Sequence, residues 1–522
     1  MDLCRISIWI AYRIAIKEEA LFDVLLDLIW GSPINLLWVV VGTVLGIAIG
    51  AIPGLTGAML IALTLPLTYS MAPAEAMVLL ISMYVGSISG GLITATLLRM
   101  PGTPASVITT LDGYPLAQSG KPGRALGLGI MSSFVGGMIS WAFLLLLAKP
   151  ISIISMKLSP FDYFSLVAVA LVLIASVSGK SLIRGLFAGM LGMLVTIPGE
   201  SPATGETRWT LGIEQLNGGF AVLPVLIGMF AVSQIIHEAS RPATKITAIA
   251  ENTDGVFLKL ADWRHHLGNM FRSSVIGTWV GILPGVGANV GSVMAYSASK
   301  GLSKNPELFG KGSEEGIIAS EAANNATIGG ALIPLVAMGI PGSVIDAILL
   351  GALVLHGLQP GALLFQNDPD IVYTIIMTML LANIAMFAIM VGTARWIAKL
   401  AVIPRHLLLP IVMAFCVVGS FALNNRLFDV WVMLGFGLVG FVLDRTKIPL
   451  APFVIGFVLA PIAEEKLGSA LQASGGSYLP LLSSPVSLVL LLVALGLAVY
   501  PIIKAWQAHG SAENQTQEAA GD

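Results

Sequence analysis

The stretch NATIGGALIPLVAMGIPGS, residues 325–343, combines two properties that rarely occur in one segment. It is apolar enough for the interior of a lipid bilayer, yet glycine and proline interrupt it, and Pro341-Gly342 predicts a break in the helix. Broken backbone at membrane depth is tolerated only where it faces protein or a water-filled cavity, because lipid offers its N–H and C=O groups no partner. The break therefore predicts a cavity.

The composition of the whole chain shows which solvent it folds in. Of its 522 residues, 56% are hydrophobic and 11% are charged, the formal net charge is −2 and the mean hydropathy is +0.88. So few charges cannot cover water-soluble domains of this length. An all-α polytopic membrane protein is predicted, and the apolar segments long enough to cross a bilayer include 125–147, 164–178, 220–236, 371–391, 407–423 and 487–503.

The chain carries an internal repeat. GIAIGAIPG (46–54) aligns with GTWVGILPG (277–285), which pairs Pro53-Gly54 with Pro284-Gly285. GGLITATLLRMPGT (90–103) aligns with GALIPLVAMGIPGS (330–343), which pairs Pro101-Gly102 with Pro341-Gly342. Because further matches follow in the same order, a duplicated unit explains them better than chance, and each copy should contain helices broken or re-entrant at its Pro-Gly motifs.

Loop charges predict that the two copies have inverted topology. Cytoplasmic loops collect Lys and Arg. Loop 118–126 is basic whereas its partner 356–370 has no Lys or Arg, and loop 198–216 is mostly acidic whereas its partner 444–447 holds two cations. Inverted repeats of this kind are typical of secondary transporters.

These observations predict the organisation of the chain and its orientation, with a cytoplasmic carboxyl terminus. The expected parts are an amphipathic interfacial segment (1–35), transmembrane repeat 1 (36–240), a cytoplasmic linker (241–266), transmembrane repeat 2 (267–465), a periplasmic loop with a final transmembrane helix (466–506) and a disordered cytoplasmic tail (507–522). The cysteines Cys4 and Cys416 match neither a disulfide framework nor a metal-ligand spacing, so no metal site is predicted.

The repeated breaks also predict a binding site near the membrane midplane. Thr103-Pro104 is typical of a helix N-cap followed by proline at the first helical position, and Ser343 with Asp346 has the capping-box spacing. A helix start presents unpaired N–H groups and a partial positive charge, so the ligand should be anionic. The predicted substrate-binding residues are Pro53, Gly54, Thr56, Arg99, Pro101, Gly102, Thr103, Pro284, Gly285, Asn289, Asn324, Asn325, Pro341, Gly342 and Ser343.

Several polar residues have two interpretations. Arg99 could be a counter-charge for a substrate carboxylate, or it could snorkel to the interface or pair with Asp112. Asn324 and Asn325 could bind substrate or Na⁺, or they could form hydrogen bonds between helices. A weaker pattern assigns ion coupling to Ser87, Ser89, Thr327 and Asp346, of which Asp346 is also explained as part of a helix cap.

Two acidic residues near the basic stretch 299–311 have a simpler interpretation. Glu315 and Glu321 are expected to be solvated or salt-bridged charges at the membrane interface.

Long motifs identify a resemblance to a known family. EAANNATIGGALIPLVAMGIPGS (321–343), LLGALVLHGLQPG (349–361), GAIPGLTG (50–57) and LDGYPLAQSGKPGRALG (111–127) resemble the large membrane subunit of the tripartite tricarboxylate transporters, the TctA family, over roughly residues 21–505. The resemblance implies a non-enzymatic, multi-pass transporter of bacterial inner membranes, driven by a Na⁺ or H⁺ gradient without any other cofactor. It also implies two partners, a periplasmic carboxylate-binding protein and a small four-span membrane subunit.

The resemblance leaves the substrate open. Where an Asn is expected before the first Pro-Gly motif, this chain has Arg99-Met100, and a tricarboxylate such as citrate, a dicarboxylate or an aromatic acid all fit an anion site. The lipid bilayer is the expected surroundings, a homo-oligomer is an open alternative, and no nucleic-acid partner is expected.

Two other classes of function were weighed. An intramembrane aspartyl protease could use Asp112 and Asp346, two acids in apolar surroundings, but they do not occupy equivalent repeat positions and no catalytic motif flanks them. A structural membrane scaffold would leave the duplicated breaks unexplained. Transport is therefore the favoured function.

Overall fold

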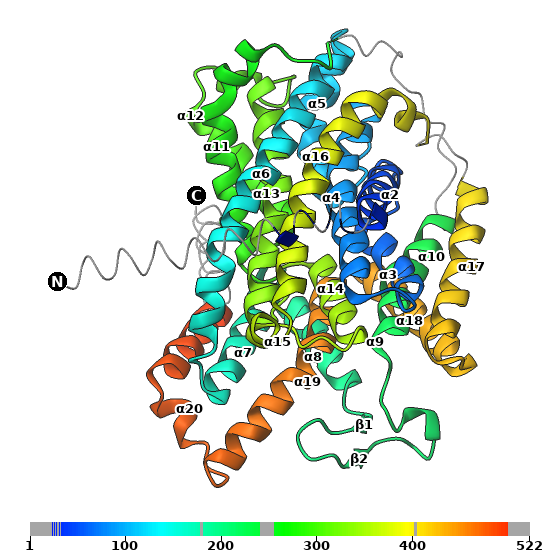
Figure 1. The fold of residues 1–522 in the computed structure, drawn as a ribbon, viewed down its shortest axis with the longest axis vertical. Coiled ribbons are helices and arrows are strands. Elements are labelled where there is room, and N and C mark those ends of the chain that lie inside the picture. The colour runs from blue at the N-terminus through cyan, green and yellow to red at the C-terminus, as the bar shows by residue number, and fades with distance from the viewer. Residues whose placement is uncertain are drawn as a thin grey trace, which may run out of the picture.

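The computed structural model describes residues 33–177, 181–240, 255–400 and 405–499, together with a few positions between 23 and 31. The predicted interfacial segment (most of 1–35), the first part of the predicted linker (241–254) and the predicted tail (507–522) lie outside the described residues. The described chain is almost entirely helical, apart from a small hairpin whose antiparallel strands β1 (Gly199–Glu200) and β2 (Thr207–Arg208) pair Gly199 with Arg208 (Figure 1).

The described helices fall into two series that correspond to the two predicted repeats. The first series is α2 (Pro33–Gly50), α3 (Gly57–Thr68), α4 (Pro73–Leu98), η2 (Pro104–Val107), α5 (Thr109–Gln118), α6 (Pro122–Ser155), α7 (Pro160–Val177), α8 (Leu182–Val195), η3 (Glu214–Leu216), α9 (Val222–Leu226), η4 (Ile227–Val232) and α10 (Ser233–Ala239). The second is α11 (Leu260–Ile282), α12 (Gly287–Leu302), η5 (Pro306–Leu308), α13 (Glu314–Met338), α14 (Val344–Leu355), α15 (Ala362–Asn367), α16 (Pro369–Leu400), α17 (Arg405–Asn424), α18 (Leu427–Arg445) and α19 (Leu450–Ala473), followed by α20 (Leu479–Ser483).

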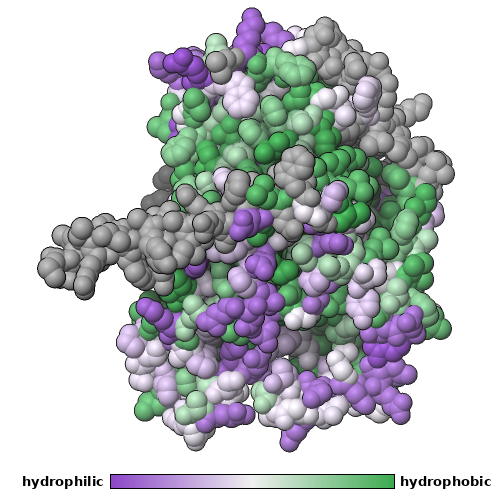
Figure 2. Space-filling model, in the orientation of Figure 1, coloured by the Kyte–Doolittle hydropathy of each residue, from purple (hydrophilic) through white to green (hydrophobic). Residues whose placement is uncertain are grey.

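The distribution of polar and apolar side chains is that of a protein folded in lipid. Six described helices are long and apolar enough to cross a membrane. Large apolar side chains point outward, with Leu146, Ile183 and Trp431 each about two-thirds or more exposed (66%, 70% and 70%), whereas many Ser and Thr side chains are fully enclosed. Figure 2 shows apolar residues covering much of the upper half of one face, with hydrophilic ones at its top edge and over its lower part. The prediction of an all-α polytopic membrane protein is confirmed.

Helices α4 and α13 form the centre of the fold. Every residue of α4 from Ala76 to Leu98 is buried, and so is every residue of α13 from Gly316 to Ala337. A helix buried on all sides need not present an apolar face to lipid, which explains why α13 can carry polar residues. Helix α13 packs against α6 and α11, and α4 packs against α2 and α16.

Glycines let these central helices approach their neighbours closely. A methyl group built on Gly46 of α2 would lie 2.5 Å from the carbonyl oxygen of Met83 in α4. At the equivalent position of the second series, one on Gly277 of α11 would lie 2.3 Å from the carbonyl oxygen of Ala323 in α13. The predicted duplication therefore has matching contacts, while the predicted inversion of the two copies stays a prediction.

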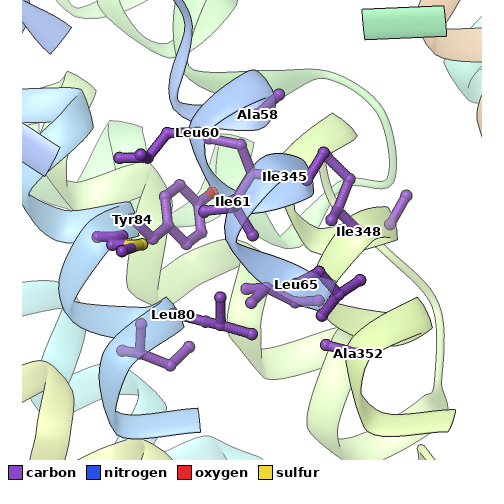
Figure 3. Close-up of a cluster of buried hydrophobic side chains, with 14 of the residues drawn as sticks. Ala58, Leu60, Ile61, Leu65, Leu80, Tyr84, Ile345, Ile348 and Ala352 are labelled. Carbon is purple, nitrogen blue, oxygen red and sulfur yellow. The ribbon is translucent and has the colours of Figure 1, made fainter. Parts of the chain in front are cut away.

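The two series meet where α3 packs between α4 and α14. Figure 3 shows Ile61 and Leu65 of α3 between Leu80 and Tyr84 of α4 on one side and Ile345 of α14 on the other. These side chains belong to the main apolar core.

Two predicted boundaries fall inside helices. The predicted linker ended at residue 266, but α11 begins at Leu260. The predicted end of repeat 2 at residue 465 lies within α19, which continues to Ala473, so residues 466–473 are helix and not loop.

Candidate substrate cavity

A cavity of about 420 Å³ lies where four broken helices restart. Its lining includes Thr56-Gly57 at the start of α3, Thr103-Pro104 at the start of η2, Gly285–Val290 at the start of α12 and Ser343-Val344 at the start of α14. The volume suits a small organic ligand. All four chain breaks predicted from the Pro-Gly motifs therefore supply residues to one cavity.

The two helix starts of the first series have side-chain caps. Thr56 has extended backbone, and its hydroxyl accepts from the N–H of Met59 at 3.2 Å. Thr103 caps η2 together with Ser106, and Pro104 occupies the first helical position as predicted. The backbone stays helical through Ile108 into α5, so Pro104–Gln118 acts as one restarted helix. Each cap fixes one helix end beside the cavity.

The two helix starts of the second series are tied together. The N–H of Gly285, just before α12, donates to the carbonyl oxygen of Gly342 at 2.7 Å. Ser343 caps α14, and its hydroxyl accepts from the N–H of Asp346 at 3.3 Å. The hydroxyl of Tyr84, from α4, lies 3.3 Å from that of Ser343 and joins the two series at the cavity wall.

The same glycine contact recurs in both series. A methyl group on Gly342 would lie 2.8 Å from the carbonyl oxygen of Gly281, and one on Gly102 would collide with the carbonyl oxygen of Gly50. The first of these pairs therefore repeats the second at aligned positions. Glycine is required at both breaks because the returning chain passes directly against the end of the preceding broken helix.

Helix starts and neutral polar side chains form the polar part of the described cavity lining. None of the described residues that line it is Asp, Glu, Lys, Arg or His; its polar side chains are Thr56, Tyr84, Thr103, Asn289 and Ser343. Helix starts carry partial positive charge and free N–H groups, and a water-excluding protein interior strengthens their effect. The remaining wall is apolar and includes Phe230, Ile345 and Ile455.

The predicted site residues fall into three groups by position. Those lining the cavity are Thr56, Thr103, Gly285, Asn289 and Ser343. Those in the breaks, outside the described lining, are Pro53, Gly54, Pro101, Gly102, Pro284, Pro341 and Gly342. Those placed elsewhere are Arg99, Asn324, Asn325, Ser87, Ser89, Thr327 and Asp346.

Arg99 lies outside the cavity, and its backbone explains its position. It is the residue that ends α4, with a left-handed φ of 54°. The aligned residue that ends α13 is Gly339, with φ 71°. The Arg99 side chain is exposed, and its guanidinium lies 5.6 Å from the centre of the Tyr114 ring. The structure therefore does not bring Arg99 to a ligand in this cavity.

One contact of the predicted buried amides and hydroxyls joins two helices, and the others lie within a single helix. Ser89 of α4 donates to Oδ1 of Asn325 in α13 at 2.6 Å, and Asn325 donates to the carbonyl oxygen of Glu321. Thr327 donates to the carbonyl oxygen of Asn324, and Ser87 donates to that of Tyr84. Among these, the Ser89–Asn325 contact is the one that corresponds to the alternative interpretation of interhelical bonding.

Two buried aspartates differ in their surroundings. Asp112 accepts from the backbone N–H groups of Gly310, Gly312 and Ser313 at 2.8–2.9 Å and from the Tyr296 hydroxyl at 2.8 Å, so it holds a loop in place. Asp346 is buried in the first turn of α14. The contacts of Asp112 with the loop and with Tyr296 give it a structural role.

The structure also shows a buried acid that the sequence interpretation placed at the interface. Glu321 is fully enclosed in α13, and its carboxylate accepts from the hydroxyls of Thr109 and Ser133. The prediction of a solvated or salt-bridged charge is wrong. The available signal was the lack of Lys or Arg three or four residues away, where the chain has Ile317, Ile318, Asn324 and Asn325.

Comparison with known proteins shows the family of the chain. An uncharacterised protein of Agrobacterium vitis, described as a 52.8 kDa protein in the TAR-I ttuC' 3'region, is 31% identical over 472 residues, 90% of this chain and 94% of the relative. A second, described as an uncharacterised protein in the TAR-II ttuC' 3'region of the same organism, is 35% identical over 44% of this chain and 96% of its own length. No solved structure matches the chain. Residues 36–455 match the sequence pattern of the tripartite tricarboxylate transporter TctA family, a family of transporter components, and the chain belongs to that family.

Proposed function

We propose that this chain is the translocation subunit of a secondary transporter that carries a carboxylate across a bacterial inner membrane, driven by a Na⁺ or H⁺ gradient. The observation that carries the proposal is the convergence of four helix starts on one cavity of about 420 Å³. Tripartite transporters contain further components. Here these are a periplasmic protein that delivers the carboxylate and a small four-span membrane subunit.

The cavity suits a carboxylate in two ways. Its helix starts and the hydroxyls of Thr103 and Ser343 can donate hydrogen bonds to carboxylate oxygens. The apolar wall formed by Phe230 and Ile345 can contact a carbon skeleton. Backbone amides recognise the negative charge of a ligand more than the shape of its carbon skeleton. The delivering protein would therefore determine which tricarboxylate, dicarboxylate or monocarboxylate is carried.

Alternating access would move the elements that bear the helix starts. In the proposed mechanism the two series are inverted copies, and α3 with α14 moves against α4 and α13, the two central enclosed helices. The close contacts between breaks, such as Gly285 with Gly342, would keep the helix starts of one series together during this motion.

Uptake by purified protein tests the proposal. The chain, with its small membrane subunit, would be reconstituted into proteoliposomes and given a panel of radiolabelled citrate, succinate and benzoate, with and without the periplasmic protein and with imposed Na⁺ or H⁺ gradients. Accumulation of one carboxylate that requires the gradient and is stimulated by the periplasmic protein supports the proposal. Absence of both accumulation and exchange for every carboxylate would contradict it and favour a scaffold.

A further inference from the structure

We propose that Glu321 is the side chain that carries a proton through the transport cycle and so couples transport to a proton gradient. This inference rests on the proposed function. It assigns the coupling ion and the residue that binds it, neither of which the cavity alone provides.

The surroundings of Glu321 suit a group that changes charge. One carboxylate oxygen accepts from the hydroxyl of Thr109 and the other from that of Ser133 at 3.2 Å. The Thr109 hydroxyl also lies 3.1 Å from that of Ser320. A hydroxyl can donate to an ionised carboxylate or accept from a protonated one. Both protonation states of Glu321 can therefore be hydrogen-bonded with small rotations of the same partners.

The carboxylate also lacks a permanent counter-charge. Within the part of the chain that the structure describes, no Lys, Arg or His side chain pairs with Glu321, although it is 0% exposed. An ionisable group enclosed at membrane depth is costly and marks a functional site in most membrane proteins. Protonation of Glu321 removes the free-energy cost of the enclosed charge, and deprotonation restores it, once in each cycle.

Asp112 of α5 and Arg124 of α6, on two helices that pack against α13, bind other partners. On α5, Asp112 binds the loop at residues 310–313 and the hydroxyl of Tyr296 from α12. On α6, Arg124 pairs with Glu314 and with Asp262 of α11. Their partners keep these groups from neutralising Glu321.

Three further titratable side chains on helices packed against α13 contact residues other than Glu321. Arg272 of α11 donates to Asn269, and His266 of α11 lies 3.5 Å from Glu314. Tyr84 of α4 lies against Ser343 at the cavity wall, close to the start of α14 that holds Asp346. None of these supplies a counter-charge to Glu321 among the described contacts.

Two contacts connect Glu321 and its neighbour Ser320 to helices that line the cavity. Thr109, its partner on α5, follows the lining residue Ala105 by four positions on the restarted helix. On α12, Ser292 follows the lining residue Asn289 by three positions and donates to the carbonyl oxygen of Ser320 at 3.1 Å. Movement of either helix start around a substrate would shift the groups that hold Glu321.

Each transport cycle carries one proton inward, because Glu321 is protonated once and deprotonated once. With the cavity open outward, the carboxylate takes a proton from external water and becomes neutral, and the substrate anion binds at the helix starts. With the cavity open inward, substrate leaves, the carboxyl releases the same proton to internal water, and Thr109 and Ser133 again donate to the anion.

The test compares Glu321→Gln with Glu315→Gln in proteoliposomes whose membrane potential is clamped at zero. The probe is whichever radiolabelled carboxylate of the citrate, succinate and benzoate panel the wild type exchanges. Glu321→Gln mimics the neutral acid, so it should exchange internal for external carboxylate but lose accumulation under an inward proton gradient, with the final inside-to-outside ratio falling to about one. Glu315, partly exposed in the first turn of α13, should tolerate the same change with full accumulation.

Three results would overturn the inference, and they are distinguishable. If Glu321→Gln accumulates carboxylate under a proton gradient as well as the wild type does, Glu321 is not the proton-carrying residue. If accumulation by the wild type requires Na⁺ and moves no protons, the proton is not the coupling ion. Wild type that neither exchanges nor accumulates any carboxylate removes the proposed function itself, and this inference with it.

A second pair of variants keeps the test decisive if Glu321→Gln does not fold. Thr109→Val removes the hydroxyl that donates to Glu321 with little change of shape, whereas Thr109→Ser keeps it. We expect the pH of half-maximal uptake to shift in Thr109→Val and to stay at the wild-type value in Thr109→Ser. Identical pH profiles for the two variants would contradict the assignment.

Discussion

The substitution Asn289→Asp tests whether the cavity selects its ligand by charge. Asn289 lies in the first turn of α12, lines the cavity and is exposed to it. The change keeps the shape of the side chain and adds one negative charge where the helix start tolerates it, so folding should be preserved. With a separation of about 6 Å and an effective dielectric constant of about 20, the repulsion of one ligand charge is about 3 kcal/mol. That corresponds to a loss of affinity of about 100-fold for a monocarboxylate, and more for a tricarboxylate.

The measurement is binding of the labelled carboxylate to purified protein, with Asn305→Asp as the matched control. Asn305 is exposed in the loop before η5 and outside the described lining, so the same chemical change there should leave affinity unaltered. Equal affinities for the Asn289→Asp and Asn305→Asp proteins would refute anion selection at these helix starts.

Three other substitutions have distinct expected outcomes. Arg99→Gly should keep uptake within about twofold and raise stability by up to about 1 kcal/mol, because glycine adopts the left-handed backbone at lower cost; a loss of uptake would restore Arg99 as a substrate residue. Replacing Pro101 and Pro341 together by alanine should reduce uptake by about tenfold or more, since continuous helix could then fill the breaks; full uptake would count against the broken-helix site. Asp112→Asn should lower the free energy of unfolding by about 2 kcal/mol, because the neutral side chain binds the three loop N–H groups less strongly. A thermal-unfolding assay measures this effect, and an unchanged unfolding temperature would show that these hydrogen bonds contribute little to stability.

The features that could be predicted are those that local sequence specifies. Composition identified a protein folded in lipid, and the repeated Pro-Gly motifs located the four chain breaks. The cap at Ser343 follows from short-range chemistry between its hydroxyl and the N–H of Asp346 three residues ahead, so spacing was enough to find it. Thr103 was found from the proline at the first helical position, and its N–H donates to the hydroxyl of Ser106. Their convergence on one cavity is consistent with the internal repeat.

The features that could not be predicted depend on what lies beside each helix. Glu321 resembles an interfacial acid in sequence, because nothing local shows that α5 and α6 enclose it with hydroxyls. Asn325 is directed to Ser89, more than two hundred residues away in the chain. Arg99 was misleading for another reason: its charge suggested a ligand, whereas its backbone position, aligned with Gly339, is that of a helix end.

Labelling of single cysteines tests the cavity most directly. In a background with both native cysteines replaced, Thr56, Thr103, Asn289 and Ser343 would each be changed to cysteine and exposed to a charged, membrane-impermeant thiol reagent, with Leu146→Cys as the lipid-facing control. All four cavity positions should react and be protected by the transported carboxylate, while the control should react only with a lipid-soluble reagent. Four positions that resist the charged reagent, or that react without protection by any carboxylate, would contradict a wet anion site built from helix starts.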